Sequence, residues 1–549
     1  MTRMPGIRMT GGRALVEMLM RNGIDTLFAL PGVQNDALFV ALYDAGEAIR
    51  VIHPRHEQAA AYMALGYAKA GGRPGAFAVV PGPGLLNTTA ALSTAWATNA
   101  PVLCISGQIP SDLIGRGFGL LHEIPDQLAI LKGLTKYAAR INHPTEAGKI
   151  VNEAFRQLAD GRPRPVAVEM PLDVMALATD VALPEGVAAS PQPAPDTDLV
   201  DKAADLLAAA KQPLIYVGSG AMAAGAEVAA LAERLQAPVV TYTGGKGIVS
   251  DRHWAAQNML GGQELWKTCD VALAVGTRLN QPLTRWGTDA NIKIIRVDLD
   301  PVEITRVSRP AISLVADAKE TCAALLAALE TRGGKPASRE EELKAVKAKS
   351  LAHLRERLGP QCEYIDAIRA ELPDDGILVE DLTQVGYVSR LGFPVYRPRT
   401  YINSGYQGTL GFGYATALGA KVARPDVPVV SLSGDGGFMY NVQELSTAAL
   451  HGIDAIALVF ADGAYGNVRR MQKDDYGNRL IATELLNPNF PKMADSYGIA
   501  GVRALSPTEL RRELAAAIKR RGPTLIEVPV GEMPDPWPVL ITGRVRGSR

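Results

Sequence analysis

The sequence has few cysteines, no excess of either charge and no long apolar run. Cys104, Cys269, Cys322 and Cys362 are too far apart to form a disulfide framework or a CxxC metal site. Lys plus Arg and Asp plus Glu both number 57, so the net charge is zero and offers no basis for binding nucleic acid or an anionic membrane. No apolar stretch reaches the roughly 18 residues of a membrane-spanning helix, and the start of the chain lacks a signal-peptide core. We therefore expect a cytoplasmic protein with reduced cysteines and no nucleic-acid or membrane partner.

The sequence contains enough apolar residues for several hydrophobic cores. Of its 549 residues, 47% are hydrophobic and 21% are charged, which predicts three or four domains. Helix and strand patterns alternate along the chain, as in α/β folds with doubly wound parallel sheets. A Pro-, Ala- and Gly-rich linker at 181–199 and a charged stretch at 331–357 divide these patterns. We expect domains at 1–180, 190–340 and 360–549, the last including a C-terminal tail.

Two distant segments repeat the same order of features. Gly82-Pro83-Gly84 precedes a helical pattern with Ser93-Thr94-Ala95 and then a strand, and Gly434-Asp435-Gly436 precedes one with Ser446-Thr447-Ala448 and then a strand. The matching order and spacing predict first and third domains of related topology. In the middle domain, Gly218-Ser219-Gly220 is a weak dinucleotide signal, because the acid expected about 20 residues later is not clearly placed. We interpret it as a Rossmann-like structural turn.

The rest of the chain is organised around residues 429–472. An apolar strand at 429–433 stops at Gly434-Asp435-Gly436-Gly437, and a second at 455–460 stops at Ala461-Asp462-Gly463. A helical pattern joins them, which predicts a parallel βαβ unit. Ligands of such sheets bind beyond the carboxyl ends of the strands. We therefore expect Asp435 and Asp462 to lie close together at a ligand site.

Two carboxylates beside glycines suit one kind of ligand. Mg²⁺ takes one or two protein carboxylates and completes its coordination with phosphate oxygens and water. Gly434, Gly436 and Gly437 allow backbone N–H groups to approach phosphates. The alternative is an ordinary strand-to-helix turn with a capping aspartate. That alternative accounts for Asp435 alone, but not for Asp462 at a matching strand end.

The GDGGF motif at 434–438, with an Asp-containing loop after the next strand, resembles the thiamine-diphosphate motif of the acetolactate synthase and pyruvate decarboxylase superfamily. The resemblance covers nearly all of 10–530 and is strongest to acetolactate synthase (large subunit)-like proteins. It implies the three-domain thiamine-diphosphate-binding fold, with Mg²⁺ bound by Asp435, Asp462 and the backbone of Ala464. The family usually has Asn-Asn where this chain has Ala461-Asp462, and aspartate is a competent Mg²⁺ ligand.

The same resemblance assigns residues that hold the rest of the cofactor. His56-Glu57-Gln58 matches a helix start whose Glu lies beside N1′ of the aminopyrimidine, whereas the alternative is a Glu favoured by the helix dipole. The segment 404–413 matches GxxGTMGFG, so that the Gly408 carbonyl accepts from the 4′-amino group and Leu410 is the apolar wedge. The full cofactor-binding set is Pro31, Gly82, Asn87, Thr383, Gln384, Gly408, Leu410, Gly434, Asp435, Gly436, Gly437, Asp462, Ala464, Tyr465 and Gly466.

Two first-domain residues join Glu57 as catalytic candidates. His122 replaces the Gln of the family's Phe-Gln-Glu segment, and a neutral imidazole there could move a proton to or from substrate. The alternative, a histidine of a surface loop, has equal weight. Gln108 lies in Ser106-Gly107-Gln108-Ile109-Pro110, which resembles the family's TGQVP.

The resemblance implies a thiamine-diphosphate- and Mg²⁺-dependent lyase or carboligase, a decarboxylase or transferase of a 2-oxo acid or related carbonyl compound. Alternatives are cleavage of a diketone or acyloin, and an FAD-linked oxidoreductase of the pyruvate oxidase type with FAD in the middle domain. A non-catalytic nucleotide-binding module is a third class, against which Glu57 together with Asp435 argues. The resemblance also implies a homodimer or homotetramer with active sites at the subunit interface. The donor and acceptor substrates, and any regulatory subunit, stay open.

Overall fold

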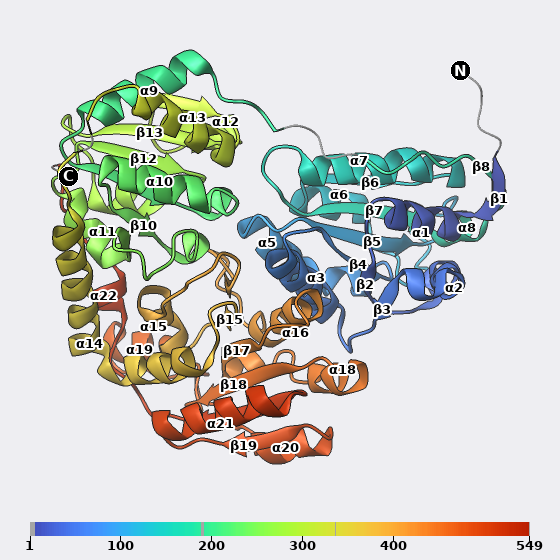
Figure 1. The fold of residues 1–549 in the computed structure, drawn as a ribbon. Helices are drawn as coiled ribbons and strands as arrows, with labels where there is room; N and C mark the ends of the chain where they lie inside the picture. Colours follow the sequence, from blue (N-terminus) through green and yellow to red (C-terminus); the bar gives the residue numbers. More distant parts are fainter. Residues whose placement is uncertain (1–5, 188–191, 335, 548–549) are drawn as a thin grey trace.

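The chain folds into three α/β units, each built on a six-stranded parallel sheet. This is a computed structural model, and it describes residues 6–187, 192–334 and 336–547; residues 188–191 of the predicted linker lie outside the described residues. Figure 1 shows the first unit in blue and cyan, the middle unit in green and the third from yellow to red. The predicted doubly wound α/β fold is confirmed.

The first sheet has the strand order β3-β2-β4-β5-β7-β6, and all of its strand pairs are parallel. A short antiparallel pair, β1 (Ile7–Thr10) with β8 (Ala178–Val181), closes the unit at its outer end. The strands are β2 (Thr26–Ala29), β3 (Arg50–Ile52), β4 (Gly75–Val79), β5 (Val102–Gln108), β6 (Tyr137–Arg140) and β7 (Val166–Pro171), and the helices are α1 (Gly11–Arg21), α2 (Asp36–Ala45), α3 (Glu57–Gly71), α4 (Pro83–Leu86), α5 (Thr89–Ala97), α6 (Gln127–Leu134), α7 (Ala147–Ala159) and α8 (Leu172–Ala176).

The third sheet has the order β16-β15-β17-β18-β20-β19. When the strands are numbered within each six-stranded sheet, the first and third sheets both have the order 2-1-3-4-6-5, so the predicted relation between the two units is confirmed. The strands are β15 (Ile377–Glu380), β16 (Tyr401–Asn403), β17 (Val429–Gly434), β18 (Ala455–Ala461), β19 (Ala500–Arg503) and β20 (Thr524–Pro529), and the helices are α15 (Gln384–Gly392), α16 (Gly413–Ala423), α17 (Asp435–Phe438), α18 (Glu444–His451), α19 (Gly466–Asp474), α20 (Phe490–Ser496), α21 (Pro507–Arg520) and α22 (Trp537–Leu540).

The middle sheet has the order β11-β10-β9-β12-β13-β14. Numbered within the unit this is 3-2-1-4-5-6, the strand order of the Rossmann fold. The strands are β9 (Pro213–Val217), β10 (Val239–Thr241), β11 (Ala256–Gln257), β12 (Val271–Val275), β13 (Lys293–Asp298) and β14 (Ile312–Val315), and the helices are α9 (Thr197–Ala209), α10 (Gly225–Leu235), α11 (Met259–Trp266), α12 (Pro301–Thr305) and α13 (Ala318–Glu330).

Two local differences from the sequence expectations have physical causes. The charged stretch after the middle unit is part of a 32-residue helix, α14 (Glu340–Glu371), that runs past residue 360 into the third unit. Leu358 has non-helical angles within it, because Pro360 lacks an N–H and its ring crowds the preceding turn. The Gly-rich segment after β17 is not an open loop but one helical turn, α17.

The first and third units share one hydrophobic core within the chain. Helices α3 and α16 cross in it, and the ring of Tyr62 on α3 meets Phe412 edge to face with centroids 5.7 Å apart. A Cβ atom at Gly66 would lie 2.0 Å from the carbonyl oxygen of Thr416, so the two backbones pack at a distance that only glycine allows. Among the described residues, we find no helix with both the length and the hydropathy needed to cross a membrane.

Candidate active site

Two buried strands bring the predicted metal ligands together. β17 and β18 are hydrogen-bonded neighbours, with Gly434 opposite Phe460, so Asp435 and Asp462 follow them at the same sheet edge. Asp435 is only 2% exposed. Its Oδ2 accepts from the Gly463 backbone N–H at 2.8 Å and from Asn487 Nδ2 at 2.6 Å, and its Oδ1 accepts from the N–H of Gly436 at 2.9 Å. The predicted proximity of the two strand ends is therefore seen directly.

Asp462 is held by its own partners. Gln384 Nε2 donates to its Oδ2 at 3.0 Å, and the Ala464 N–H donates to its Oδ1 at 3.2 Å. Burial, together with the nearby negative charge of Asp435, raises the pKa of Asp462 to about 6. A divalent cation bound here would offset the charge that disfavours ionisation of Asp462.

The surroundings of these carboxylates fit Mg²⁺ and a phosphate group. A Cβ at Gly436 would lie 2.8 Å from the Tyr465 ring, and one at Gly466 would lie 2.4 Å from Asp462 Oδ2. Packing of Tyr465 and Asp462 against the backbone therefore requires glycine at both positions, which leaves the backbone beside the two carboxylates without side chains. In the part of the chain that the structure describes, no group of three or more His, Cys, Asp or Glu side chains is arranged so that it could hold a metal ion. Two carboxylates suit Mg²⁺, which keeps water and phosphate in its remaining positions.

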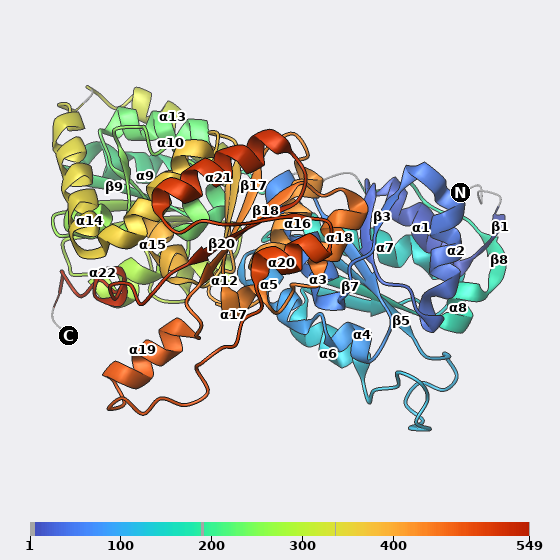
Figure 2. The same ribbon diagram turned by 90° about the horizontal axis from the view of Figure 1, so that it is seen from below.

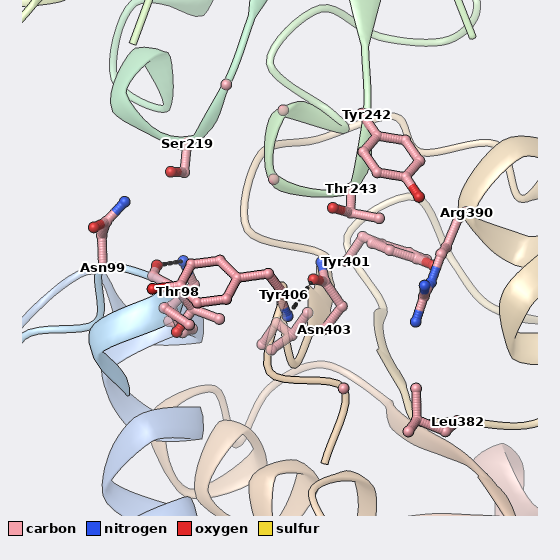
Figure 3. Close-up of a pocket in the computed structure, with 18 of the residues that line it drawn as sticks. Thr98, Asn99, Ser219, Tyr242, Thr243, Leu382, Arg390, Tyr401, Asn403 and Tyr406 are labelled. Atoms are coloured by element: carbon pink, nitrogen blue, oxygen red, sulfur yellow. Dashed lines mark hydrogen bonds between the residues drawn. The ribbon is translucent and has the colours of Figure 1, made fainter. Parts of the chain in front are cut away.

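A cavity of about 1060 Å³ opens in front of this sheet edge. Figure 3 shows a part of it, where Ser219, Tyr242 and Thr243 of the middle unit face Thr98 and Asn99 of the first and Tyr406 of the third. Every third-unit residue of the predicted cofactor set lines the cavity: Thr383, Gln384, Gly408, Leu410, Gly434, Asp435, Gly436, Gly437, Asp462, Ala464, Tyr465 and Gly466. Trp537 of the C-terminal tail lines it as well.

The predicted residues of the first unit do not line this cavity; they are Pro31, Glu57, Gly82, Asn87, Gln108 and His122. Glu57 is the first residue of α3, and its Oε2 accepts from Asn87 Nδ2 at 3.0 Å. The helix start is fixed because Glu444 of α18 accepts from the N–H groups of Arg55 and His56, at 3.0 and 3.1 Å. Asn87 and Pro31 are exposed in the single chain.

The loop between β5 and α6 holds His122 against the Gly82 turn. Gly82 has φ +57, and a Cβ there would lie 2.4 Å from the carbonyl oxygen of His122. The His122 ring is half-buried, and its Nδ1 lies 3.0 Å from Gln34 Oε1. Gln108 Oε1 accepts from the N–H of the next residue at 2.8 Å, so this carbonyl is turned toward its own backbone.

Four polar residues that sequence patterns did not reveal organise the predicted ones. Gln127 accepts from the Gly82 N–H, Gln34 meets His122, Glu444 fixes the start of α3, and Asn487 donates to Asp435. These partners are separated along the chain by 45, 88, 389 and 52 residues. No local spacing could have identified them.

Comparisons with known proteins agree with this architecture. Residues 9–130 match the N-terminal TPP binding domain of thiamine pyrophosphate enzymes, 200–325 match the central domain, and 381–528 match the C-terminal TPP binding domain. Thus the units of related topology are the two that match TPP binding domains.

Full-length relatives are similar over almost the whole chain. A probable 2-ketoarginine decarboxylase of Pseudomonas aeruginosa is 35% identical over 95% of this chain and 94% of its own length. A probable acetolactate synthase large subunit of Methanocaldococcus jannaschii is 33% identical over 95% and 92%. The acetolactate synthase isozyme 1 large subunit of Escherichia coli is 30% identical over 98% and 96%.

The resemblance predicted from the motifs is confirmed by these matches. The chain belongs to the thiamine pyrophosphate enzyme family, as an acetolactate synthase-like, thiamine-diphosphate-dependent enzyme of carbon–carbon bond chemistry.

Proposed function

We propose that the protein is a Mg²⁺- and thiamine-diphosphate-dependent lyase or carboligase that acts on a 2-oxo acid or a related carbonyl compound. The observation that carries this proposal is the pair Asp435 and Asp462 at neighbouring strand ends, linked by the Gly463 N–H and facing one large cavity. The similarity to acetolactate synthases and to a probable 2-ketoarginine decarboxylase supports a 2-oxo acid as substrate.

The third unit would hold the cofactor and its metal. Asp435, Asp462 and the backbone carbonyl of Ala464 would bind Mg²⁺, and the backbone at Gly436 and Gly437, where the Gly436 N–H already donates to Asp435, would receive the diphosphate. Leu410 and Gly408 line the same cavity and would fix the conformation of the thiamine moiety. The remaining residues of the proposed cofactor-binding set are Pro31, Gly82, Thr383, Gln384, Gly434, Tyr465 and Gly466. Thiamine diphosphate, when bound, would supply a carbon nucleophile for the substrate carbonyl and an electron sink for the bond broken beside that carbonyl.

Glu57 would hold a proton at N1′ of the aminopyrimidine. Asn87 Nδ2 occupies one of its carboxyl oxygens, while the other, Oε1, lies 3.6 Å from the position that a Cβ on Gly84 would take. The carboxyl group is therefore oriented by one amide and keeps one oxygen for a ligand, as a positioned general acid or base requires.

His122 and Gln108 are the candidates for contact with substrate. Gln34 fixes the His122 ring through Nδ1, so the opposite ring nitrogen would be the one that exchanges a proton with substrate. Gln108 is buried at the end of β5, and its amide would orient the substrate from the carboxyl end of that strand.

The site would be completed by a second copy of the chain. Within one chain, the third-unit residues line the cavity, whereas the six first-unit residues do not. Figure 2 shows the β5–α6 loop and α19 both projecting beyond the sheets. Phe118 and Leu121 on that loop are 65% and 62% exposed, and Ile481 after α19 is 74% exposed, so both segments present apolar side chains that association would bury. A homodimer or homotetramer would place the first unit of one protomer over the third unit of its partner.

The same inference extends to compartment and to domain limits. Cys104, Cys269, Cys322 and Cys362 are free and buried, which supports a reduced, cytoplasmic protein. We retain domain limits near 1–180, 190–340 and 360–549, with α14 crossing the last boundary.

Calorimetry and product analysis test the proposal. The wild-type protein should bind thiamine diphosphate only with Mg²⁺, Asp435→Ala should lose that binding, and Asp462→Asn should retain it. A screen of 2-oxo acids, acyloins and cyclic diketones, with identification of products, would then name the reaction. Unchanged cofactor affinity in Asp435→Ala would refute the metal assignment.

An FAD-linked oxidoreductase is a second candidate, because the cavity extends to the Gly218-Ser219-Gly220 turn of a sheet with Rossmann order. Asp298 also lines it, but both of its oxygens accept from the Arg162 guanidinium at 3.1 Å. A Cβ at Gly218 would lie 2.6 Å from the Gly276 carbonyl oxygen, so packing between two turns already explains this glycine. A visible spectrum of the purified protein without a flavin band near 450 nm would remove this candidate.

A further inference from the structure

The segment that follows β20 crosses directly over the residues that hold Asp462. Residues 531–537 run between α15 and α19, the helices that begin beyond β15 and β18. Gln384 opens α15 and is 9% exposed. Its amide contacts both this segment, called the tail strap below, and the predicted metal ligand Asp462.

All of the hydrogen-bonding capacity of the Gln384 amide is used. Nε2 donates to Asp462 Oδ2 at 3.0 Å and to the Gly531 carbonyl at 3.1 Å. Oε1 accepts from the Met533 N–H at 2.8 Å and from Arg470 at 3.4 Å. A backbone N–H can only donate and a carbonyl can only accept, so the tail strap determines which end of the amide faces Asp462.

The tail strap is anchored on its other side by α19. The guanidinium of Arg470 donates to the Met533 carbonyl at 2.5 Å and to Asp535 at 3.4 Å. Trp537 Nε1 donates to Asn467 Oδ1 at 2.5 Å, and the indole packs on Tyr387 of α15 with ring centroids 5.0 Å apart. The strap therefore joins α15 to α19 across the end of the sheet, and Trp537 reaches the cavity itself.

We propose that Gln384 is a positioning residue that couples the tail strap to the Asp462 carboxylate, so that order in the strap and binding at the cofactor site favour each other. This inference rests on the proposed function. When the strap is in place, the amide presents an N–H to Asp462 Oδ2 and fixes the direction in which the remaining lone pairs point. When the strap detaches, the amide loses the two backbone partners that orient it, and Asp462 loses its fixed donor. Because coupling between two sites is reciprocal, ligand binding must stabilise the strap as much as the strap stabilises binding.

Hydrogen–deuterium exchange and calorimetry on the full-length protein test this coupling. In the wild type, Mg²⁺ with thiamine diphosphate should slow exchange of the peptide that covers 531–537. Gln384→Met keeps the side-chain length but removes every hydrogen bond, so strap exchange should become fast and insensitive to cofactor, and Kd for thiamine diphosphate should rise about tenfold. Asp535→Ala removes strap contacts with Arg470 and with the Trp537 N–H, and Asp535 itself neither contacts Asp462 nor lines the cavity. It should loosen the strap and raise Kd in the same direction by a smaller factor.

The outcomes separate this inference from the function on which it rests. If the wild type does not bind thiamine diphosphate in calorimetry, the proposed function fails. If it binds but exchange at 531–537 does not change, the coupling is refuted whatever the variants do. A strap loosened by Asp535→Ala with unchanged Kd would also overturn it, and would leave Gln384 as a residue that acts on Asp462 alone. Because the wild-type and Asp535→Ala measurements stand alone, a Gln384→Met variant that failed to fold would not prevent a decision.

Discussion

Asp381 is a buried carboxyl group whose partners are all backbone N–H groups. It follows β15, is 1% exposed, and accepts from Leu382 at 2.8 Å and from Gly413, the first residue of α16, at 2.9 Å. Burial nevertheless raises its pKa to about 7, against the lowering effect of these hydrogen bonds. The residue thus caps α16 at an electrostatic cost that depends on pH.

That cost predicts how Asp381→Asn changes stability. Between about pH 4 and 7 the folded state keeps a proton that the unfolded chain has released, so this group makes the protein less stable as pH rises, and the penalty is complete above pH 7. The neutral Asn avoids the penalty and can still accept one N–H. Its Tm relative to wild type should therefore increase from pH 5 to pH 8, by an amount equivalent to at most about 3 kcal/mol.

Scanning calorimetry of the cofactor-free protein at several pH values measures this difference. Asp44→Asn, at an exposed position of α2, is the matched control for loss of one negative charge. A Tm difference for Asp381→Asn that stays constant with pH would show that the buried carboxyl does not titrate in this range.

Glu57→Gln tests the role of the other key carboxyl group. The amide keeps the size and can still pair with Asn87, so the fold and most of the cofactor affinity should survive. Exchange of the C2 proton of bound thiamine diphosphate should slow by about 10²–10⁴, the usual effect of losing a general acid or base. NMR of the cofactor-saturated variant measures that exchange, and a wild-type rate would mean that another acid has this role.

At the residue level, the sequence placed the two proposed metal ligands together, but it did not reveal the residues that hold them. Asp435 and Asp462 were recognisable because each directly follows an apolar strand, a local pattern that topology turns into proximity. Asn487 and Glu444 have no such pattern, since their partners are brought close only by tertiary folding. The structure was needed to find them.

At the scale of elements, the crossing of α3 and α16 joins the two units that hold the predicted site. A Cβ at Gly66 would lie 2.0 Å from the Thr416 carbonyl oxygen, and one at Gly419 would lie 1.9 Å from that of Met63. The two glycines thus lie on facing helices, each against the other's backbone. This crossing sets where Glu57, at the start of α3, lies relative to the third sheet.

Gly66→Ala should therefore separate the two helices. Because the obstacle is backbone and cannot rotate away, we expect destabilisation of at least about 1–3 kcal/mol, the usual cost of overpacking. Gly133→Ala on α6 is the control, since a Cβ there meets nothing within 4 Å. Alanine there should be neutral or stabilising by up to about 1 kcal/mol. Denaturant unfolding compares the two variants, and equal stabilities would contradict close packing at this crossing.

The main helices and strands were largely predictable from the sequence, whereas short helical turns and helix ends were not. The strands predicted at 429–433 and 455–460 are found at Val429–Gly434 and Ala455–Ala461, because each is a continuous apolar run that stops at turn residues. The helical turn α17 was not predicted, since glycines weaken every helical pattern. The length of α14 was not predicted, because its charged first half indicated a division between domains.

At the scale of the molecule, the first and third units are joined within one chain, but their predicted site residues do not meet there. The first and third units share a core within the chain, yet Glu57 and its neighbours do not line the cavity that holds Asp435. A shared core therefore does not by itself assemble a complete site. Two copies related by a twofold axis would resolve this, because each would present its first unit to the third unit of the other.

Mixing two inactive variants distinguishes a shared site from a site within one chain. In a dimer of Glu57→Gln with Asp435→Ala, one site would carry both substitutions and the other would carry neither. Random pairing makes half of the dimers mixed, so about one quarter of wild-type activity should return after joint refolding or co-expression. Each variant alone should stay inactive apart from the residual rate of Glu57→Gln, which is the control. If both groups serve the same chain, every site in every dimer carries one substitution and no activity returns.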